Sequence, residues 1–597
     1  HKGVGTVKKS YKNISEFIDM LDAAGELVRI KDEVSPIVEI SKYADAESKK
    51  PDGGKALLFE NVVDNGRKSF PVAVNLFGSD RRMSAALGIE RLADAGREIA
   101  ELTEANPPKS FADFWDLAKK TLPLARILPR KFRGCPPCQE VVKTGKDIDL
   151  SEIPVLKCWP HDGGRFITLP LVFTKSPDGK KRNLGMYRLQ VYDADTTGMH
   201  WHVHKDGSHF FKEYAKAKKR MPVAVAIGAD PATIYAATAP MPRGIDELLL
   251  AGFFRKKGVP MAKCISVDME VPADAEFVLE GYVDCDERRL EGPFGDHTGY
   301  YSLADMYPVF HLTAITRKEK PIYCATLVGP PPMEDCYMAK ATERVFLPLL
   351  KTVMPEIKEY FLPWEGVFHN IAVVSIEKEF PAHAQKLASG LWGQGQMSFC
   401  KSLTVVDESV DPSDLRAVWR KFVESFDPKS DAMISSGVLD ALDHSAPNPL
   451  HGAKIAIDLT ERTDGEAPRS VKKLSPADES SVAKIGAYLK AELPQFDRLC
   501  ARDFFCAVAV KKGESRGRDI LEKLKHAPDL AEHFKVAAIF DPEVDISDNS
   551  KILWKIFNNT DPSRDIIFGE PCLLDACKKN AADGHTREWP DDLSFDK

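Results

Sequence analysis

The stretch Glu276-Phe-Val-Leu-Glu-Gly-Tyr-Val-Asp284 is one of eight short runs that decide the fold of the middle of the chain. It is rich in Val, Phe and Tyr, which favour extended backbone. Similar runs occupy 166–174, 184–192, 199–204, 221–228, 264–271, 307–316 and 321–328. Ser176-Pro-Asp-Gly179 supplies a turn after the first run, since Pro and Gly favour turn dihedrals. The sequence therefore predicts a β-rich central domain with the form of a barrel.

Helix and strand patterns alternate on both sides of this domain. Ile14, Phe17, Ile18 and Leu21 form one helical stripe that ends at Gly25. Further elements are expected at 55–62, 70–77 and 91–126 before the central domain, and at 340–351, 369–376 and 413–425 after it. The polar stretch 460–480 is typical of a linker. We predict a multidomain α/β (α+β) protein.

The C-terminal part contains an internal repeat. Segments that begin at Lys401 and Lys535 share nine identities in register at a fixed offset (535 − 401 = 134), among them Asp411/Asp545 and Asp427/Asp561. The pattern of strand, Asp-rich turn, helix and Asp-Pro turn indicates a duplicated α/β unit. The predicted domains are 1–126, 127–335, 336–470 and 471–597.

Composition limits the classes of function. Lys and Arg nearly balance Asp and Glu (82 − 89 = −7), so no global positive field favours nucleic-acid binding. The sequence shows neither a long apolar run nor a signal-like start, which predicts a cytoplasmic protein. Its 12 cysteines are scattered, as expected for reduced thiols. The pair Cys135-Pro-Pro-Cys138 lacks a second half-site for zinc, so a metal or redox role is disfavoured.

Polar residues interrupt the β-rich middle at three places. The first is Asn183-Leu-Gly-Met-Tyr187-Arg188, followed by His200, His202 and His204. Alternate residues of a strand share one face, so the three histidines suit a metal or phosphate site. An exposed polar strand face explains the same pattern equally well.

The second place is Glu247, on a predicted helix that carries leucine and phenylalanine on nearly every side. Leu250 and Phe254 share its face, so the carboxylate is not simply directed at water. A buried carboxylate needs a partner. Arg243 is the structural candidate and a metal is the functional one, and the helix alone does not choose between them.

The third place is Glu291-Gly-Pro-Phe-Gly-Asp296-His297, where a tight turn separates two carboxylates. Repulsion between them, or apolar walls, would raise the pKa of one and leave a proton donor near neutral pH. A hydrogen-bonded surface turn is the alternative, and this motif by itself favours it.

Together and in order, these motifs resemble the UbiD-type decarboxylases. The resemblance runs from about residue 10 to 470 and includes KCISVDMEVPADAEFVLEGYVD at 263–284, LEGPFGDHTGYYS at 290–302 and GADPATI at 228–234. It implies a central split β-barrel that binds flavin, flanked by α/β domains. Asp at position 296, where Glu is common, resembles the quinone-precursor branch, which acts on polyprenyl-hydroxybenzoate or on a dihydroxynaphthoate of the menaquinone pathway.

The resemblance also implies roles for individual residues. The catalytic trio falls on Arg188, Glu291 and Asp296, and the metal ligands fall on Asn183, His204 and Glu247. The cofactor contacts fall on Met186, Tyr187, Arg188, His200, Trp201, His202, Lys205, Asp206 and Lys401. The implied cofactors are prenylated FMN and Mn2+, with Mg2+ as a substitute and K+ as a further ion. An amide, an imidazole and a carboxylate leave coordination positions of a divalent ion open for phosphate oxygen.

The implied reaction is the reversible, non-oxidative decarboxylation of an aromatic or α,β-unsaturated acid. Arg188 holds the substrate carboxylate and Asp296 acts as general acid. The implied partners are an aromatic acid, CO2, a flavin prenyltransferase that supplies the cofactor and further copies of the chain in a homo-oligomer. Peripheral membrane contact is expected only for a polyprenylated substrate.

Three other classes remain as alternatives. A zinc hydrolase would use the His200/His202/His204 motif without flavin. A flavin reductase would need a nicotinamide site, for which Gly390-Leu-Trp-Gly393-Gln-Gly395 is a weak match because it ends a helical pattern. A non-catalytic assembly subunit would lack a catalytic carboxylate, whereas Glu291 and Asp296 are both present.

Overall fold

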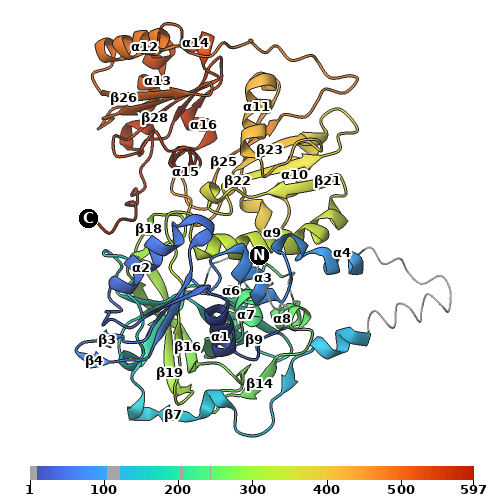
Figure 1. Ribbon diagram of the computed structural model, residues 1–597, viewed down its shortest axis with the longest axis vertical. Helices are drawn as coiled ribbons and strands as arrows, with labels where there is room; N and C mark the ends of the chain where they lie inside the picture. Colours follow the sequence, from blue (N-terminus) through green and yellow to red (C-terminus); the bar gives the residue numbers. More distant parts are fainter. Residues whose placement is uncertain (1–9, 104–121, 202–205, 242–243, 597) are drawn as a thin grey trace, which may run out of the picture. The chain divides into compact units, whose positions relative to one another are not determined.

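The computed structural model describes residues 10–103, 122–201, 206–241 and 244–596. The chain divides into two compact units, residues 1–346 with 591–597 and residues 347–590. Figure 1 labels their helices and strands, with the first unit running from blue to green. None of the helices in these ranges is long and apolar enough to cross a membrane.

The first unit is built on a nine-stranded antiparallel sheet. Its order is β10-β9-β13-β16-β19-β12-β11-β8, and β7 also pairs with β19. The strands are β7 Val141–Thr144, β8 Arg165–Ile167, β9 Pro170–Lys175, β10 Arg182–Gly185, β11 Leu189–Val191, β12 Thr196–Gly198, β13 Met221–Ile227, β16 Phe277–Glu291 and β19 Asp305–Arg317. The sheet curls into a half-barrel, and its end strands β10 and β8 do not pair with each other within the described chain. The predicted barrel is therefore an open half-barrel.

The structure tests one predicted turn and two predicted strands of this domain. The turn between β9 and β10 is confirmed, because Gly179 N–H donates to Ser176 O at 2.8 Å. The predicted strand 199–204 is wrong where the structure describes it, and the predicted strand 264–271 is found only at its last two residues. Residues 199–201 lie outside any strand, and the chain between β14 (Pro260–Lys263) and β15 (Glu270–Pro272) forms a loop. Backbone N–H groups of Met199 and His200 bond instead to Pro308 O and Arg188 O.

Smaller elements cover the half-barrel. A four-stranded sheet has the order β1 (Leu27–Ile30), β2 (Ala56–Phe59), β5 (Val72–Val74) and β20 (Tyr323–Cys324). The helices include α1 Ile14–Ala23, α2 Glu39–Ser48, α3 Asp80–Leu87, α6 Asp206–Lys216, α7 Pro231–Ala236, α8 Glu247–Arg255 and α9 Glu334–Val353. The predicted stripe on α1 is confirmed, since Ile14, Phe17, Ile18 and Leu21 are all buried. Gly25 follows at a φ of +72°, where glycine carries no steric cost.

The second unit contains two five-stranded sheets of identical order. In the first C-terminal sheet the order is β21 (Ile357–Phe361), β22 (Ile371–Ile376), β23 (Ser402–Asp407), β25 (His451–Asp458) and β24 (Ala432–Val438). In the second C-terminal sheet it is β26 (Phe496–Arg502), β27 (Phe505–Val510), β28 (Val536–Phe540), β30 (Cys572–Asp575) and β29 (Ile566–Ile567). The associated helices are α10 His383–Trp392, α11 Leu415–Ser425, α12 Glu479–Glu492, α13 Gly517–Lys525, α15 Asn549–Asn559 and α16 Pro562–Asp565. Residues 461–478 between the sheets contain no regular element, as predicted for 460–480.

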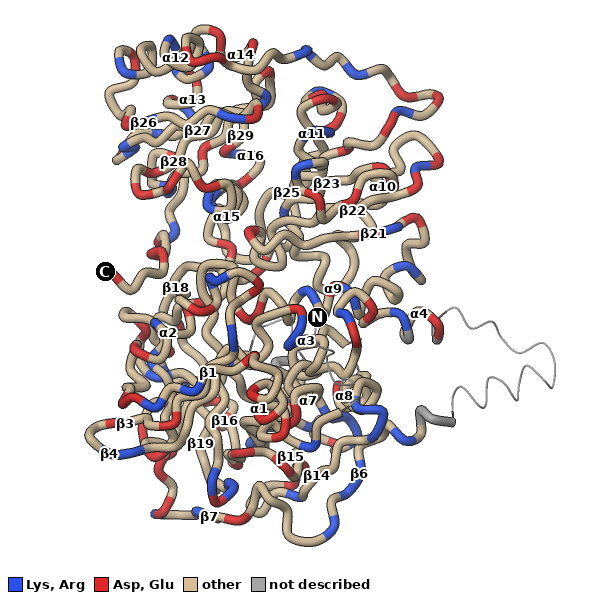
Figure 2. The backbone as a smooth tube through the Cα atoms, in the orientation of Figure 1, with Lys and Arg blue, Asp and Glu red and all other residues tan. Residues whose placement is uncertain are grey.

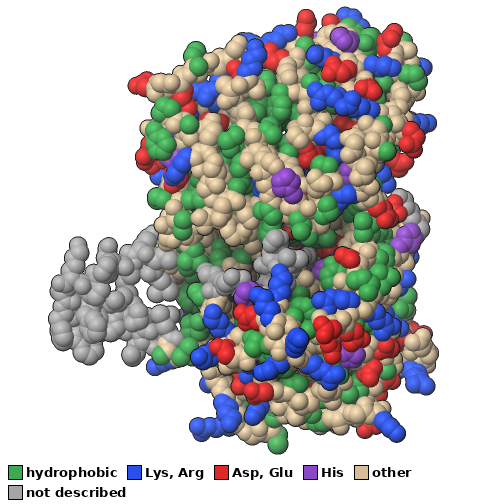
Figure 3. Space-filling view, turned by 180° about the vertical axis from the view of Figure 1, so that it is seen from behind, with side chains coloured by type: hydrophobic (Ala, Val, Ile, Leu, Met, Phe, Trp, Pro, Cys, Tyr) green, Lys and Arg blue, Asp and Glu red, His purple; other side chains and the backbone are tan. Residues whose placement is uncertain are grey.

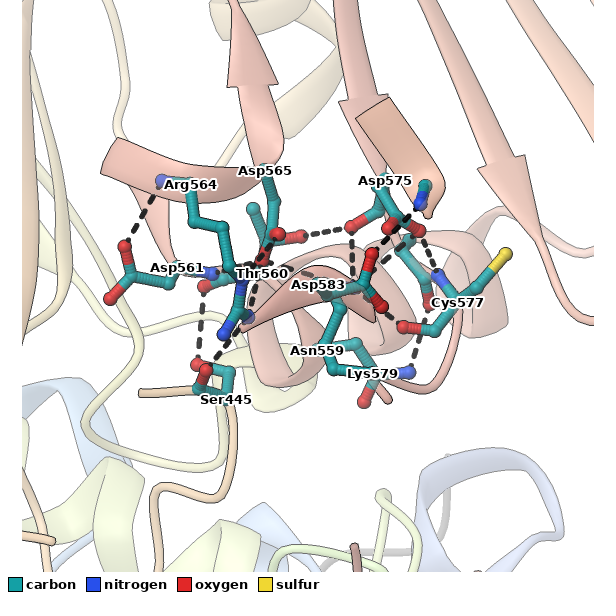
Figure 4. Close-up of polar contacts among 12 residues, drawn as sticks. Ser445, Asn559, Thr560, Asp561, Arg564, Asp565, Asp575, Cys577, Lys579 and Asp583 are labelled. Carbon is teal, nitrogen blue, oxygen red and sulfur yellow. Dashed lines mark hydrogen bonds and ion pairs between the residues drawn. The ribbon is translucent and has the colours of Figure 1, made fainter. Parts of the chain in front are cut away.

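Both C-terminal sheets bury a lysine between two carboxylates. Lys512 Nζ lies 3.0 Å from Asp575 Oδ2 and 2.5 Å from Asp583 Oδ2. Lys378 Nζ lies 2.7 Å from Glu466 Oε2 and 3.7 Å from Asp458 Oδ2. Figure 4 shows Asp575 and Asp583 of the second C-terminal sheet, with Lys579 and the Arg564–Asp565 pair nearby. Buried charges persist only when they are paired in this way.

The two C-terminal sheets also share a hydrophobic cluster. Its buried members are Val373, Val406, Val418, Phe426, Leu459, Val536 and Cys572. Polar contacts join the same sheets, since Lys535 Nζ donates to Phe426 O at 2.7 Å and Ala453 N–H donates to Asp561 Oδ2 at 3.2 Å. The two sheets therefore stabilise each other.

Charged residues of both signs are interspersed along the chain (Figure 2). The face shown in Figure 3 likewise carries basic, acidic and hydrophobic side chains in mixture. This mixture agrees with the near-balanced composition (82 − 89 = −7).

Candidate active site

Arg188 lies between two buried carboxylates. Its Nε and Nη2 donate to Glu291 Oε1 at 3.0 and 2.7 Å, and its Nη1 donates to Asp296 Oδ2 at 2.5 Å. Nη2 also donates to Ser302 Oγ at 3.0 Å, and the guanidinium lies 4.7 Å from the centre of the Phe294 ring. The side chain of Arg188 is 9% exposed and that of Glu291 is 1% exposed. The structure thus brings together all three residues of the predicted trio.

The backbone explains how residues far apart in sequence meet here. Arg188 directly precedes β11, while Glu291 ends the long strand β16. The chain then turns through β17 (Phe294–Gly295), which pairs with β18 (Tyr301–Ser302) and places Asp296 and Ser302 beside the arginine. This short hairpin sets the spacing of the two carboxylates.

The charges of this trio oppose the effect of burial. Burial acts to raise the pKa of Asp296, but its hydrogen bond with His297 and the charge of Arg188 hold that pKa well below its usual range. Burial also acts to raise the pKa of Glu291. The charge of Arg188 and the hydrogen bond with His200 have a larger effect, so the pKa of Glu291 is lowered as well. The expectation that one of the two carboxyls has a raised pKa is wrong for this arrangement, because the arginine compensates both charges.

His200 belongs to the same cluster. Its Nδ1 lies 2.8 Å from Glu291 Oε1, and its ring stacks on Tyr307 with 4.1 Å between centres. Burial and the charge of Arg188 lower the pKa of His200, although Glu291 acts against them. Glu291 Oε2 is buried and finds no hydrogen-bond partner among the described residues. That oxygen is free to interact with a bound molecule.

Two of the three predicted metal ligands are neighbours. Asn183 lies on β10, and Glu247 is the first residue of α8, with Asp246 as its N-cap. Glu247 Oε2 accepts the backbone N–H of Leu184 at 2.9 Å, which joins the helix to the strand next to Asn183. Both side chains are buried, and Asn183 Nδ2 has no partner within the described chain. His204 and Arg243 lie outside the described residues.

Of the other predicted cofactor contacts, some are buried and some lie outside the described residues. Tyr187 and Trp201 are buried, Met186 is partly buried, and Trp201 Nε1 has no hydrogen-bond partner in the part of the chain that is described. His202 and Lys205 lie outside the described residues, and the side chain of Asp206 is not described. An unpaired amide, an unpaired indole N–H and an unpaired carboxylate oxygen fit a site for a large polar cofactor and a metal, because buried polar groups normally have partners.

Lys401, the remaining predicted cofactor contact, is buried within its own unit. It belongs to the second unit, where its buried Nζ donates to Asp443 Oδ2 at 2.8 Å and to Ser445 Oγ at 3.0 Å. The glycine-rich stretch 390–395 begins in the last turn of α10 and does not follow a strand, as the sequence predicts. Cys138 is buried, which raises the pKa of its thiol to about 12, so its reactivity is low.

Sequence reasoning missed the residues that hold the acidic hairpin in place. Asp162 accepts backbone N–H groups from Cys158, Trp159 and Gly295 at 2.7–3.0 Å. Gln190 accepts the N–H of Gly292 at 2.8 Å through its side-chain oxygen and donates to Gly163 O at 2.9 Å. A Cβ on Gly163 would lie 2.4 Å from the Gly292 Cα, so this close approach requires glycine. The sequence signal that could have indicated them is the glycine doublet Gly163-Gly164 directly after Asp162.

Comparison with known proteins assigns a class to this site. The family profile of the 3-octaprenyl-4-hydroxybenzoate carboxy-lyase Rift-related domain matches residues 130–331. The corresponding C-terminal domain matches 336–459 and 498–585, and the N-terminal domain matches 18–103. These matches cover most of the chain and place it among the carboxy-lyases. The chain belongs to the UbiD family and is a UbiD-class carboxy-lyase.

Relatives and solved structures agree with this assignment. An uncharacterized protein of Helicobacter pylori is 39% identical over 96% of this chain and 93% of its own length, and one of Archaeoglobus fulgidus is 49% identical over 76% and 92%. The vanillic acid decarboxylase of Sedimentibacter hydroxybenzoicus has a TM-score of 0.67 at 28% identity, covering 81% of this chain and all of its own. An evolved dimeric form of the UbiD-class enzyme HmfF from Pelotomaculum thermopropionicum, in complex with prFMN, has a TM-score of 0.62 at 27% identity, covering 77% and 97%. UbiD-class enzymes carry out prenylated-FMN-dependent decarboxylation of aromatic or unsaturated acids.

Proposed function

We propose that this protein decarboxylates a hydroxyaromatic acid of the quinone-precursor type, reversibly and without net oxidation, using prenylated FMN and one divalent metal. The observation that carries the proposal is the Arg188 guanidinium held between buried Glu291 and Asp296, with Glu291 Oε2 left unpaired in the described structure. The similarity to an aromatic acid decarboxylase and to an enzyme in complex with prFMN supports the substrate class and the cofactor.

In this proposal the segment 127–335 carries the cofactor site, and 1–126, 336–470 and 471–597 form further domains, the last two as copies of one duplicated unit. Asn183 and Glu247, with His204, would hold Mn2+ or Mg2+, and the ion would help to anchor the cofactor. Neighbouring buried amide and carboxylate groups support this role, since oxygen ligands suit hard divalent ions. Similarity to a dimeric enzyme supports association of this chain with further copies of itself.

Prenylated FMN, when bound, supplies an electron-accepting carbon that allows the substrate carboxylate to leave as CO2. The chain positions the substrate and moves the proton. Arg188 has five N–H groups, and four of them donate to Glu291, Asp296 and Ser302. The fifth, on Nη1, is not used in these hydrogen bonds. That N–H is available for one oxygen of the substrate carboxylate, and the buried ring of Phe294, 4.7 Å from the guanidinium, shields the arginine from water. Asp296 then delivers a proton to the vacated carbon.

The test is a screen of aromatic acids with protein co-produced with a flavin prenyltransferase, after mass analysis of the bound flavin. We expect CO2 from hydroxybenzoic or dihydroxynaphthoic acids, and a loss of turnover in Glu291→Gln at unchanged flavin content. Activity of flavin-free, metal-loaded protein would instead favour a hydrolase. Flavin oxidation by a nicotinamide, without CO2 release, would favour a reductase.

A further inference from the structure

Residues 591–596, the C-terminal segment, return to the unit that carries the candidate active site. The chain forms the second unit over residues 347–590 and then rejoins the first. The segment contains no helix or strand, so it keeps a fixed position only where its side chains and backbone are bound. Leu593 is 7% exposed within a core cluster of the first unit, and Phe595 packs against the same cluster. These two side chains anchor the segment.

The C-terminal segment pairs with the β17–β18 hairpin, next to Asp296. Tyr301 N–H donates to Asp591 O at 3.0 Å, and Leu593 N–H donates to Gly299 O at 2.9 Å. An antiparallel bridge lies between these two hydrogen bonds. The segment therefore adds a third length of paired backbone to the hairpin, on the side that follows Asp296 in the sequence.

Phe595 supports the other strand of the hairpin through Trp159. The two rings stack with 4.3 Å between their centres and 18° between their planes. Trp159 is 2% exposed, and its ring lies against Gly295, where a Cβ would come within 2.1 Å of Trp159 Cδ1. Gly295 is the last residue of β17 and directly precedes Asp296. Packing contacts therefore connect Phe595 to the backbone that bears the Asp296 carboxyl.

The hairpin needs support from outside, because it is very short. β17 and β18 contribute two residues each, and an isolated pair of strands is marginally stable at best in water. This hairpin nevertheless holds Asp296 and Ser302 at 2.5 and 3.0 Å from the Arg188 guanidinium. Asp162 and Gln190 bind the backbone before Asp296, and the C-terminal segment binds the backbone after it.

We propose that the C-terminal segment is a positioning element of the active site, which holds the β17–β18 hairpin so that Asp296 keeps its place on Arg188. Leu593 and Phe595 are positioning residues, because they act through the hairpin and Trp159. A misplacement of about 1 Å can cost about 10²-fold in rate, so loss of these anchors should lower turnover without removing a catalytic group. The inference rests on the proposed function, because it concerns the residue that delivers the proton in that reaction.

The first experiment compares Phe595→Ala with Phe70→Ala in cofactor-loaded protein. Phe70 is a matched control, because it is another partly buried phenylalanine that packs against the same core cluster, with 5.5 Å between its ring centre and that of Phe277. We expect kcat of Phe595→Ala to fall about tenfold or more at unchanged KM and flavin content. Phe70→Ala should retain kcat. Phe595→Tyr keeps the stacked ring and should retain most of the turnover.

The second experiment measures hydrogen exchange of backbone amides. The Tyr301 and Leu593 N–H groups are hydrogen-bonded between the hairpin and the C-terminal segment, so they exchange when the two separate. Their exchange should become about tenfold faster in Phe595→Ala, which loses one aromatic stack. It should stay unchanged in Phe70→Ala.

Normal kcat in Phe595→Ala, or equal losses in Phe595→Ala and Phe70→Ala, would overturn the positioning role. Unchanged exchange of the two amides in Phe595→Ala would overturn it as well, because the segment would then not hold the hairpin. CO2 release by the unmodified enzyme would leave the proposed function standing in each of these cases. If no aromatic acid is decarboxylated at all, the proposed function fails, and the exchange of the two amides still decides whether the segment holds the hairpin.

Discussion

Replacing Asp296 by Asn is the most informative single change in the trio. Oδ1 of Asp296 accepts two N–H groups of His297, and Oδ2 accepts from Arg188. An amide has one acceptor oxygen, so its NH2 group must face either Arg188 or His297, both of which are donors. The variant therefore loses the transferable proton and also gains one unfavourable donor–donor contact.

The expected loss follows from both effects. A positioned general acid contributes about 10²–10⁴-fold in rate, which corresponds to about 3–5 kcal/mol in the activation free energy. We expect kcat of Asp296→Asn to fall by this order at unchanged flavin content. Asp296→Glu is the matched control, because it retains the acid with one additional methylene and should keep most of the turnover. The assay follows CO2 release under saturating substrate. Turnover of Asp296→Asn within about threefold of the unmodified enzyme, well below the contribution of a general acid, would refute the assignment.

Three further outcomes are expected. Glu247→Gln should lower bound metal and bound flavin together, as measured by elemental and absorbance analysis, and intact flavin without metal would contradict the bridging role. Burial raises the pKa of Asp335 in the folded state, so protonation of this carboxyl favours folding. The free energy of unfolding should therefore fall by up to about 4 kcal/mol as pH rises from about 4 to about 7. Urea titrations at several pH values should show a weaker pH dependence of this free energy in Asp335→Asn, and an unchanged pH dependence would contradict the raised pKa. Phe426→Ala, in the cluster shared by the two C-terminal sheets, should cost about 3–5 kcal/mol and expose the linker 461–478 to proteolysis, whereas unaltered digestion would show that the sheets do not depend on each other.

Patterns among neighbouring residues correctly predicted a helix and a turn. The stripe of Ile14, Phe17, Ile18 and Leu21 and the Ser176–Gly179 turn are both found in the structure, because side-chain periodicity and turn dihedrals are properties of neighbouring residues. The run 199–204 failed for the opposite reason. Its alternation fits a strand, but β12 ends at Gly198 and long-range bonds to Pro308 and Arg188 fix the next residues.

The candidate site is formed by residues that are far apart in the sequence. Glu291 and Asp296 lie 103 and 108 residues from Arg188, and spacing alone does not pair them. The family resemblance predicted the three residues of the trio. The lowered pKa values of both carboxyls could be inferred only from the structure, because they depend on where Arg188 lies. Asp162 and Gln190 were not identified, because each acts through a contact that only the folded chain creates.

The decisive measurement is the release of CO2 from a hydroxyaromatic acid, compared between protein produced with and without a flavin prenyltransferase. We expect CO2 and the corresponding decarboxylated product only from the protein that contains prenylated FMN, with loss of turnover in Asp296→Asn at equal flavin content. Equal CO2 release without the flavin, or no release from any aromatic or unsaturated acid at full flavin occupancy, would contradict it.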